Sequence, residues 1–86
     1  MSEPAYTVSI SRSSQKEIRA INGGVRLRLI RSIRSLATEP RPAGCRKLVG
    51  AANRWRIRVG DYRVIYSIDD EERLIEIIAA RHRSKA

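Results

Sequence analysis

The second half of this 86-residue sequence alternates between apolar and polar residues, and this alternation constrains the fold more than any other feature. Successive side chains of a β-strand point to opposite faces of a sheet, so a period of two predicts strands. We expect strands over RWRIRV (54–59), YRVIYSI (62–68) and RLIEIIAARHR (73–83), with a tight connection at Gly60-Asp61. On the first of these strands the polar face consists of three arginines: Arg54, Arg56 and Arg58.

The first half shows a helical period after one short strand. Residues 6–10 are rich in β-branched side chains and predict that strand. Ser14 and Glu17 have the spacing of a capping box, which predicts a helix over about 12–22. This helix would end at the Asn-Gly-Gly of 22–24, because a glycine in the left-handed conformation commonly caps a helix.

A second helix is expected directly afterwards, followed by a short strand near 47–49. Its apolar stripe recurs at intervals of four or three residues: Val25, Leu29, Ile33 and Leu36. The two helices form an α-helical hairpin packed on a sheet. The order of elements predicts an α+β fold, with an N-terminal strand, the helical hairpin and then a mostly antiparallel sheet. A chain of this length forms a single domain, 1–86.

The charge of the chain points to a polyanionic partner. Eighteen basic residues, fifteen of them arginine, face nine acidic ones and give a net charge of +9. Arginine binds phosphate through a planar fork of donors and stacks on bases, and the charge balance points to RNA, DNA, an acidic protein or an anionic membrane surface. Residues 45–63 hold six basic residues and one acidic residue, which concentrates the excess on the middle strands. There is no apolar run of membrane-spanning length and no signal-peptide core, and a lone Cys45 fits a reducing cytoplasm.

Two arginines on neighbouring strands predict a phosphate site. If Ile65 pairs with Ile77, then Arg63 lies opposite Ala79 and diagonal to Arg81. Diagonal neighbours lie within ~7–8 Å of each other, and two like charges at that distance are unfavourable unless an anion lies between them.

The sequence offers no metal site and no cofactor site. One His and one Cys are too few for zinc, and the acidic run 69–72 reads as a solvated turn rather than a cation site. Gly23-Gly24 lacks the Lys and Ser/Thr of a nucleotide-binding loop. Histidine is the residue type best suited to proton transfer near neutral pH, but on a regular strand His82 faces away from Arg81. We therefore expect any catalysis to proceed without a cofactor.

Two motifs resemble a known family. Gly60-Asp61-Tyr62-Arg63-Val64-Ile65-Tyr66 and Arg81-His82-Arg83-Ser84 are similar to the RelE/ParE toxin superfamily, particularly its RelE branch. The resemblance implies a toxin of a type II toxin–antitoxin system that enters the ribosomal A site and cleaves mRNA. In that reaction the 2′-hydroxyl attacks the neighbouring phosphate and leaves a cyclic phosphate and a 5′-hydroxyl, without a metal. It also implies a cognate antitoxin as partner, for which the +9 charge favours an acidic, amphipathic helix.

The resemblance also suggests roles for individual residues. Arg63 would stabilise charge on the scissile phosphate, and Arg81 would act at the leaving-group oxygen. Arg56 and Arg58 stand where the family commonly has lysines that flank the same phosphate. The remaining residues would contact RNA or the ribosome: Lys47, Arg54 and Arg83.

The sequence departs from the family pattern at one more position. In that pattern a tyrosine that acts in proton transfer would follow Ala86. Tyr62 and Tyr66 share a face opposite Arg63 and do not replace it. This departure suggests a naturally short or a shortened chain of reduced activity, and it leaves two other interpretations open. One is a ParE-like inhibitor of DNA gyrase, and the other is a non-catalytic module that binds RNA or an antitoxin.

Overall fold

The chain folds as two helices and a five-stranded sheet, which confirms the α+β prediction. The structure, a computed structural model, describes residues 5–50 and 52–85. The elements follow in the order β1 (Thr7–Ile10), α1 (Arg12–Arg19), α2 (Gly23–Ser35), β2 (Arg46–Lys47), β3 (Arg54–Val59), β4 (Tyr62–Asp69), β5 (Leu74–His82) and a 3₁₀ turn, η1 (Arg83–Lys85). In the described part of the chain neither α-helix is long and apolar enough to cross a membrane.

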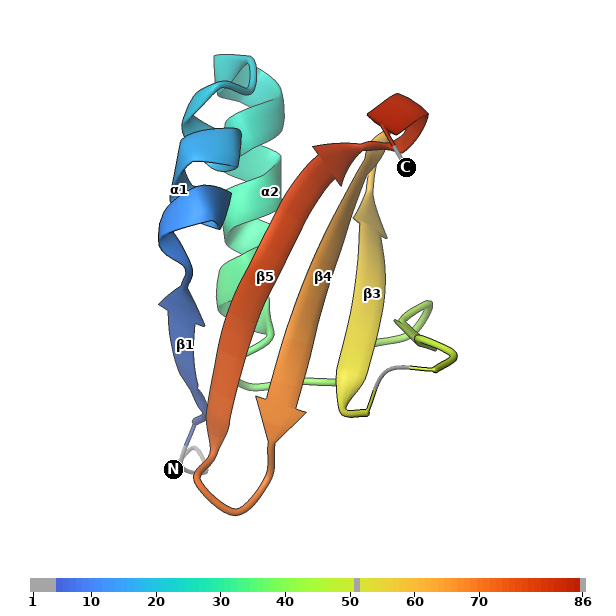
Figure 1. Cartoon of the computed structure of the whole chain (residues 1–86). Coiled ribbons are helices and arrows are strands. Elements are labelled where there is room, and N and C mark those ends of the chain that lie inside the picture. Colours follow the sequence, from blue (N-terminus) through green and yellow to red (C-terminus); the bar gives the residue numbers. More distant parts are fainter. Residues whose placement is uncertain (1–4, 51, 86) are drawn as a thin grey trace.

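The sheet has the strand order β1-β5-β4-β3-β2, so the first and last strands are neighbours. β1 runs parallel to β5, whereas the other three pairs are antiparallel. β1 pairs only with Leu74–Ile77, and the edge of β5 beyond that point is covered by α1. Figure 1 shows the two helices side by side along one face of the sheet.

The core lies between this helical layer and the sheet. Leu29, Ile33 and Leu36 of the α2 segment are fully buried, in agreement with the predicted apolar stripe. The strands contribute residues that alternate as expected from the period of two: Ile57, Val59, Val64, Tyr66, Ile68, Ile75 and Ile77. The opposite face of β3 carries the three predicted arginines and is free of helices.

The helix ends differ from the prediction in their capping residues. Ser11, not Ser14, caps α1, because its hydroxyl accepts the backbone N–H of Ser14 at 3.2 Å. Ser14 is instead fully buried, and its hydroxyl donates to the carbonyl of Ile77. α1 ends at Arg19, and Asn22 caps the next helix by accepting from the N–H of Gly24. Gly23 and Gly24 therefore begin α2 and do not terminate α1, so the predicted left-handed glycine cap was wrong.

The register between β4 and β5 also differs from the prediction. Ile65 pairs with Ala79, and Arg63 pairs directly with Arg81. The expected pairs, Ile65 with Ile77 and Arg63 with Ala79, were wrong because the turn after Asp69 sets a longer offset and a β-bulge lies at Ile65/Tyr66. A bulge adds one residue to one strand and shifts all the pairs beyond it.

The connection between β3 and β4 is a two-residue loop, as predicted. Val59 pairs with Tyr62, and Gly60 between them has a φ of 60°. A positive φ at the first loop residue matches the right-handed twist of a hairpin and is readily adopted by glycine. The following strand, β4, thereby returns alongside β3 with Arg63 opposite Arg58.

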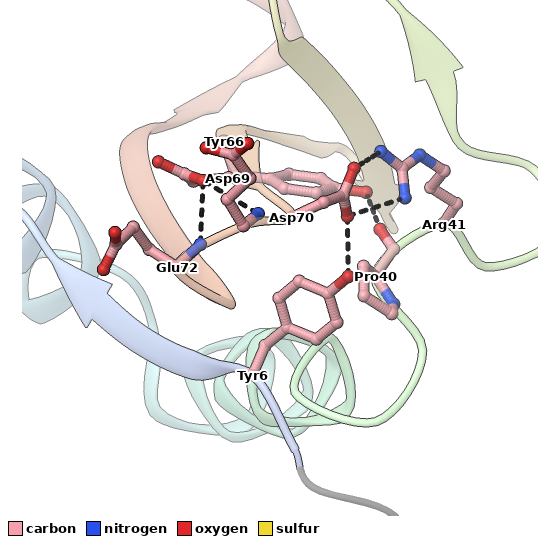
Figure 2. A network of polar contacts seen from close by, with 8 residues as sticks. Tyr6, Pro40, Arg41, Tyr66, Asp69, Asp70 and Glu72 are labelled. Carbon is pink, nitrogen blue, oxygen red and sulfur yellow. Dashed lines mark hydrogen bonds and ion pairs between the residues drawn. The ribbon is translucent and has the colours of Figure 1, made fainter.

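A polar cluster holds the opposite end of the sheet together (Figure 2). Asp70, in the turn between β4 and β5, accepts the hydroxyl of Tyr6 at 2.6 Å and pairs with Arg41 at 3.0 Å. Tyr66 donates its buried hydroxyl to the carbonyl of Pro40 at 2.8 Å. The Asp69 carboxylate accepts two backbone N–H groups of the same turn. The acidic run 69–72 is thus a partly paired turn that contacts the loop after α2. We refer to Tyr6, Arg41 and Asp70 as the Asp70 cluster.

Candidate nucleic-acid interface

Three arginines form a row across the helix-free face of the sheet. Arg58 on β3 pairs with Arg63 on β4, and Arg63 pairs in turn with Arg81 on β5. Side chains directly opposite each other in an antiparallel pair share one face, and their Cβ atoms are about 4.5–5.5 Å apart. The predicted meeting of Arg63 and Arg81 on one side of the sheet is therefore confirmed, with a closer approach than the diagonal one. We call Arg58, Arg63 and Arg81 the arginine row.

Arg63, the central member of the arginine row, has a buried hydrogen-bond donor. The Nε atom of Arg63 is buried and has no hydrogen-bond partner among residues 5–50 and 52–85. Within the same described part of the chain neither Arg58 nor Arg63 makes an ion pair. A buried polar atom without a partner is costly, and three adjacent like charges repel one another. An anion bound over the row would relieve the repulsion between the three charges.

Arg81 is the member of the row that has a carboxylate neighbour. Its Nε atom lies 3.0 Å from Oε2 of Glu17, and its side chain is 58% exposed. Arginine has five N–H donors, so a contact at Nε leaves the terminal nitrogens for another acceptor. Arg81 is therefore paired and still available to a ligand.

A second group of cations lies beside the arginine row. Arg46 of β2 pairs with Arg56 of β3, so their side chains share the face of the arginine row. A hollow of about 260 Å³ is lined by Gly44, Arg46, Arg56 and Arg58. This hollow extends the cationic surface across β3 toward the edge strand β2.

The structure brings some of the other candidate residues to this face and leaves others away from it. Arg54 pairs with Ser67 and lies on the same face as the arginine row. Lys47 pairs with Trp55, so it lies on the other face, with its Nζ atom 5.8 Å from the centre of the indole ring. Arg83 belongs to η1 and approaches the Asp61 carboxylate at 3.7 Å.

His82, Tyr62 and Tyr66 lie on the helical side of the sheet. His82 pairs with Tyr62 and contacts its ring edge-on, with the ring centres 5.2 Å apart. Its Nδ1 atom accepts the backbone N–H of Ser84 at 3.2 Å. Burial raises the pKa of the Tyr66 phenol well above its usual range, so this tyrosine remains protonated. None of these three groups reaches across the sheet to the arginine row by its strand register.

Two residues of this surface were not among the sequence candidates. From the sequence, Lys47 and not its neighbour Arg46 was named as a candidate. The alternation of side chains does not show which of the two faces the arginine row unless the pairing of β2 with β3 is known. Glu17 was assigned to a helix cap, and only the packing of α1 against β5 shows where its carboxylate goes. In the described ranges no group of three or more His, Cys, Asp or Glu side chains is placed to hold a metal ion.

Comparison with known proteins gives a consistent family. Residues 8–86 match the family described as the ParE toxin of the type II toxin–antitoxin system parDE. No curated protein sequence matches the chain. Among solved structures, the archaeal RelE–RelB complex from Pyrococcus horikoshii OT3 is 30% identical with a TM-score of 0.83, covering 95% of this chain and 99% of the other.

Two further solved structures have the same fold at lower identity. The RelBE toxin–antitoxin complex from Mycobacterium tuberculosis is 25% identical, with a TM-score of 0.81 and coverage of 92% and 99%. The intact E. coli RelBE toxin–antitoxin complex is 26% identical, with a TM-score of 0.79 and coverage of 91% and 96%. The family match spans nearly the whole sequence, and the three solved structures have the same fold as this chain. The chain therefore belongs to the RelE/ParE superfamily, in its RelE-type branch, and is a toxin of a type II toxin–antitoxin system.

Proposed function

We propose that this toxin is a ribosome-dependent endoribonuclease that cleaves mRNA in the A site, acts in the cytoplasm and is neutralised by a cognate antitoxin. One observation carries the proposal: Arg58, Arg63 and Arg81 lie side by side, and Nε of Arg63 is buried without a hydrogen-bond partner among the described residues. This arrangement suits a single phosphodiester group of a polyanion better than it suits an empty surface.

The proposed reaction uses the RNA's own nucleophile. The 2′-oxygen forms a bond to the adjacent phosphorus while the bond from phosphorus to the 5′-oxygen breaks, which gives a cyclic phosphate and a 5′-hydroxyl. The 2′-hydroxyl loses its proton and the leaving 5′-oxygen gains one. Negative charge builds up on the phosphate oxygens in between, and fixed cations stabilise that charge.

Each arginine has a distinct part in this proposal. Arg63, at the centre of the row, binds the non-bridging oxygens of the scissile phosphate. Arg81 stabilises charge at the leaving 5′-oxygen, and because a guanidinium group does not give up its proton in proteins, electrostatic stabilisation is its main role. Arg58 and Arg56 flank the same phosphate from β3. Arg54, Lys47 and Arg83 contact RNA or the ribosome more peripherally.

The antitoxin proposal is supported by an apolar groove between β1 and the helices. The groove has a volume of about 510 Å³, and its floor contains Val8, Ile18 and Ile33, while Arg19 and Arg34 also line it. An amphipathic helix with acidic flanks would match both its apolar floor and its basic rims. The P. horikoshii and E. coli relatives are RelE–RelB complexes, which supports an antitoxin partner.

Cleavage of a defined message tests the proposed activity. The protein is incubated with ribosomes that carry a known codon in the A site, and the RNA ends are mapped. We expect cleavage within the A-site codon, a cyclic phosphate on the upstream fragment, and no cleavage of the same RNA without ribosomes. An intact message on programmed ribosomes contradicts the nuclease proposal.

Inhibition of DNA gyrase is the second candidate, and the match to the ParE family favours it. The same preparation is incubated with gyrase and supercoiled plasmid. Trapped gyrase–DNA complexes together with an intact message would establish gyrase as the target. Message cleavage with normal gyrase activity would support the ribonuclease.

A further inference from the structure

Glu17 connects helix α1 to strand β5 through both of its carboxylate oxygens, one of which contacts the arginine row. Oε1 accepts the backbone N–H of Ala80 at 2.8 Å, and Oε2 accepts Nε–H of Arg81 at 3.0 Å. The Glu17 side chain is 30% exposed, so these contacts are partly shielded from water. Among residues 5–50 and 52–85, the arginine row receives no other ion pair.

The short first strand makes this contact possible. β1 pairs with β5 only as far as Ile77, so the N–H of Ala80 on the same edge has no strand to donate to. α1 follows β1 and brings Glu17 to this edge, where the carboxylate takes the place of a strand carbonyl. One oxygen is therefore fixed to the backbone, and the other is held in a defined position beside Arg81.

The contact leaves the part of Arg81 that binds phosphate available. Glu17 engages Nε, which lies nearest the backbone, whereas the two terminal nitrogens carry the remaining N–H donors of the fork. An arginine side chain has many rotamers, and a fixed partner at Nε restricts them before any ligand binds. The 58% exposure of Arg81 is consistent with a side chain that is anchored near its base and open at its tip.

We propose that Glu17 is a positioning residue that orients Arg81 toward the scissile phosphate, so that Arg81 stabilises the leaving oxygen in the transition state. The inference rests on the proposed ribonuclease function and adds a residue from the helical layer to that site. Glu17 does not contact the RNA, and it acts through the orientation of Arg81. The opposite possibility is a carboxylate that competes with phosphate for Arg81, and the experiments below separate the two.

The first experiment compares Glu17→Gln with Glu76→Gln in single-turnover cleavage on programmed ribosomes. A glutamine at 17 keeps an oxygen for the Ala80 N–H but its amide NH₂ cannot accept from Arg81. Glu76 is exposed on β5, the strand that carries Arg81. Its substitution therefore removes an equal charge and leaves the contact between Glu17 and Arg81 in place. We expect the rate constant of Glu17→Gln to fall on the order of tenfold, because a misdirected catalytic group is costly.

The concentration dependence distinguishes positioning from binding. The ribosome concentration that gives half the maximal rate should agree within about twofold between the two variants, because a single exposed charge contributes little to affinity. A rate constant equal to or above that of Glu76→Gln overturns the inference. A loss that appears only as weaker binding overturns it too.

The second experiment needs no cleavage. The Nε–H signal of Arg81 is followed by NMR in the wild type and in Glu17→Gln, before and after addition of a 2′-O-methyl RNA oligonucleotide. We expect a downfield, slowly exchanging signal in the wild type that persists in the RNA complex. If the RNA moves this signal to the position seen in Glu17→Gln, Glu17 competes with phosphate and the inference fails.

The two experiments also separate this inference from the proposed function. Normal cleavage by both variants leaves the ribonuclease intact and removes only the role of Glu17. Absence of cleavage by the wild type removes the ribonuclease, and the NMR result then decides whether Glu17 still orients Arg81 toward a bound phosphate.

Discussion

Arg63 differs from its two neighbours in the arginine row by its surroundings. Arg58 and Arg81 are exposed, whereas Arg63 is half-buried at the centre of β4, with its Nε atom shielded from water. A buried guanidinium edge is preorganised, because the protein and not the solvent determines its direction. Among the three, we therefore expect Arg63 to contribute most to stabilising charge on the phosphate.

Replacing Arg63 tests whether it contributes most to cleavage. Arg63→Ala should lower the single-turnover rate of message cleavage by about 10²–10³-fold, the usual effect of removing a preorganised transition-state donor. Arg63→Lys should recover little of it, because an ammonium group lacks the planar fork. Arg31→Ala, on the exposed side of α2, is the matched loss of one charge and should retain the rate. Equal losses at 31 and 63 would contradict the assignment.

Replacing a single buried residue, Ile77, tests how the core is packed. Ile77 is fully buried on the helical side of β5, and Ser14 donates to its carbonyl. Ile77→Ala should lower the free energy of unfolding by about 2–5 kcal/mol, through lost apolar contact and the cavity left behind. Urea unfolding followed by circular dichroism measures the change, with Leu27→Ala as an exposed apolar control. A loss no larger than that of the control would contradict the packing.

Among the elements, the β4–β5 pair shows what the sequence could and could not predict. The period of two correctly placed Val64, Tyr66 and Ile68 on the buried face and the arginines of β3 on the other. The pairing of Arg63 with Arg81 was missed because the bulge at Ile65/Tyr66 depends on how two strands fit together. Alternation within one strand contains no information about its offset from the next.

The prediction of the cap of α1 was wrong for a related reason. Ser11, Ser13 and Ser14 all suit the start of a helix by type, and the spacing of Ser14 to Glu17 favoured the wrong one. In the structure the backbone of β5 provides partners for both Ser14 and Glu17. Those partners lie more than sixty positions away in the sequence, so no local pattern could reveal them.

The Asp70 cluster predicts how the turn between β4 and β5 responds to acid. Hydrogen bonds from Arg41, and secondarily from Tyr6, hold the pKa of the Asp70 carboxyl below its usual range. A carboxyl with a lowered pKa in the folded state stabilises the protein above its unfolded-state pKa, and this contribution disappears as the pH falls through the folded-state pKa. We expect the wild type to be more stable than Asp70→Asn at pH 7, and the difference to shrink in strong acid.

Urea unfolding of both proteins at neutral and acidic pH measures this difference. The other carboxylates are common to the two proteins, so their titration cancels in the comparison. The effect at pH 7 should be smaller than that of Ile77→Ala, because the cluster is exposed. A difference that grows on acidification would contradict the contribution of the Asp70 carboxylate.

For the whole molecule, the charge is spread over two layers. Residues 12–35, which form the helical hairpin, contain seven basic residues and one acidic residue, a net charge of +6 out of +9. The sequence prediction stressed the middle strands alone, yet the helices carry a comparable excess. Both layers contribute to long-range attraction of a polyanion, whereas the arginine row provides its local geometry.

Salt dependence separates these contributions. The apparent affinity for programmed ribosomes should fall steeply as the salt concentration rises, because bound cations displace counterions from phosphates. Arg56→Ala should weaken binding at every salt concentration and reduce the slope of log K against log salt by about 1. Binding titrations between 50 and 200 mM salt, the range in which such contacts lose most affinity, measure the slope. An unchanged slope would show that Arg56 makes no phosphate contact.

The neighbouring positions of β1 and β5 have a consequence for synthesis. The first strand can find its hydrogen-bonding partner only after translation has passed Ile77, and the arginine row is complete only once Arg81 has been added. The β3–β4 hairpin is local and can form early, whereas closing the sheet joins segments separated by nearly the whole sequence, which is slow. A nascent chain interrupted before β5 would thus lack both a finished sheet and a complete arginine row.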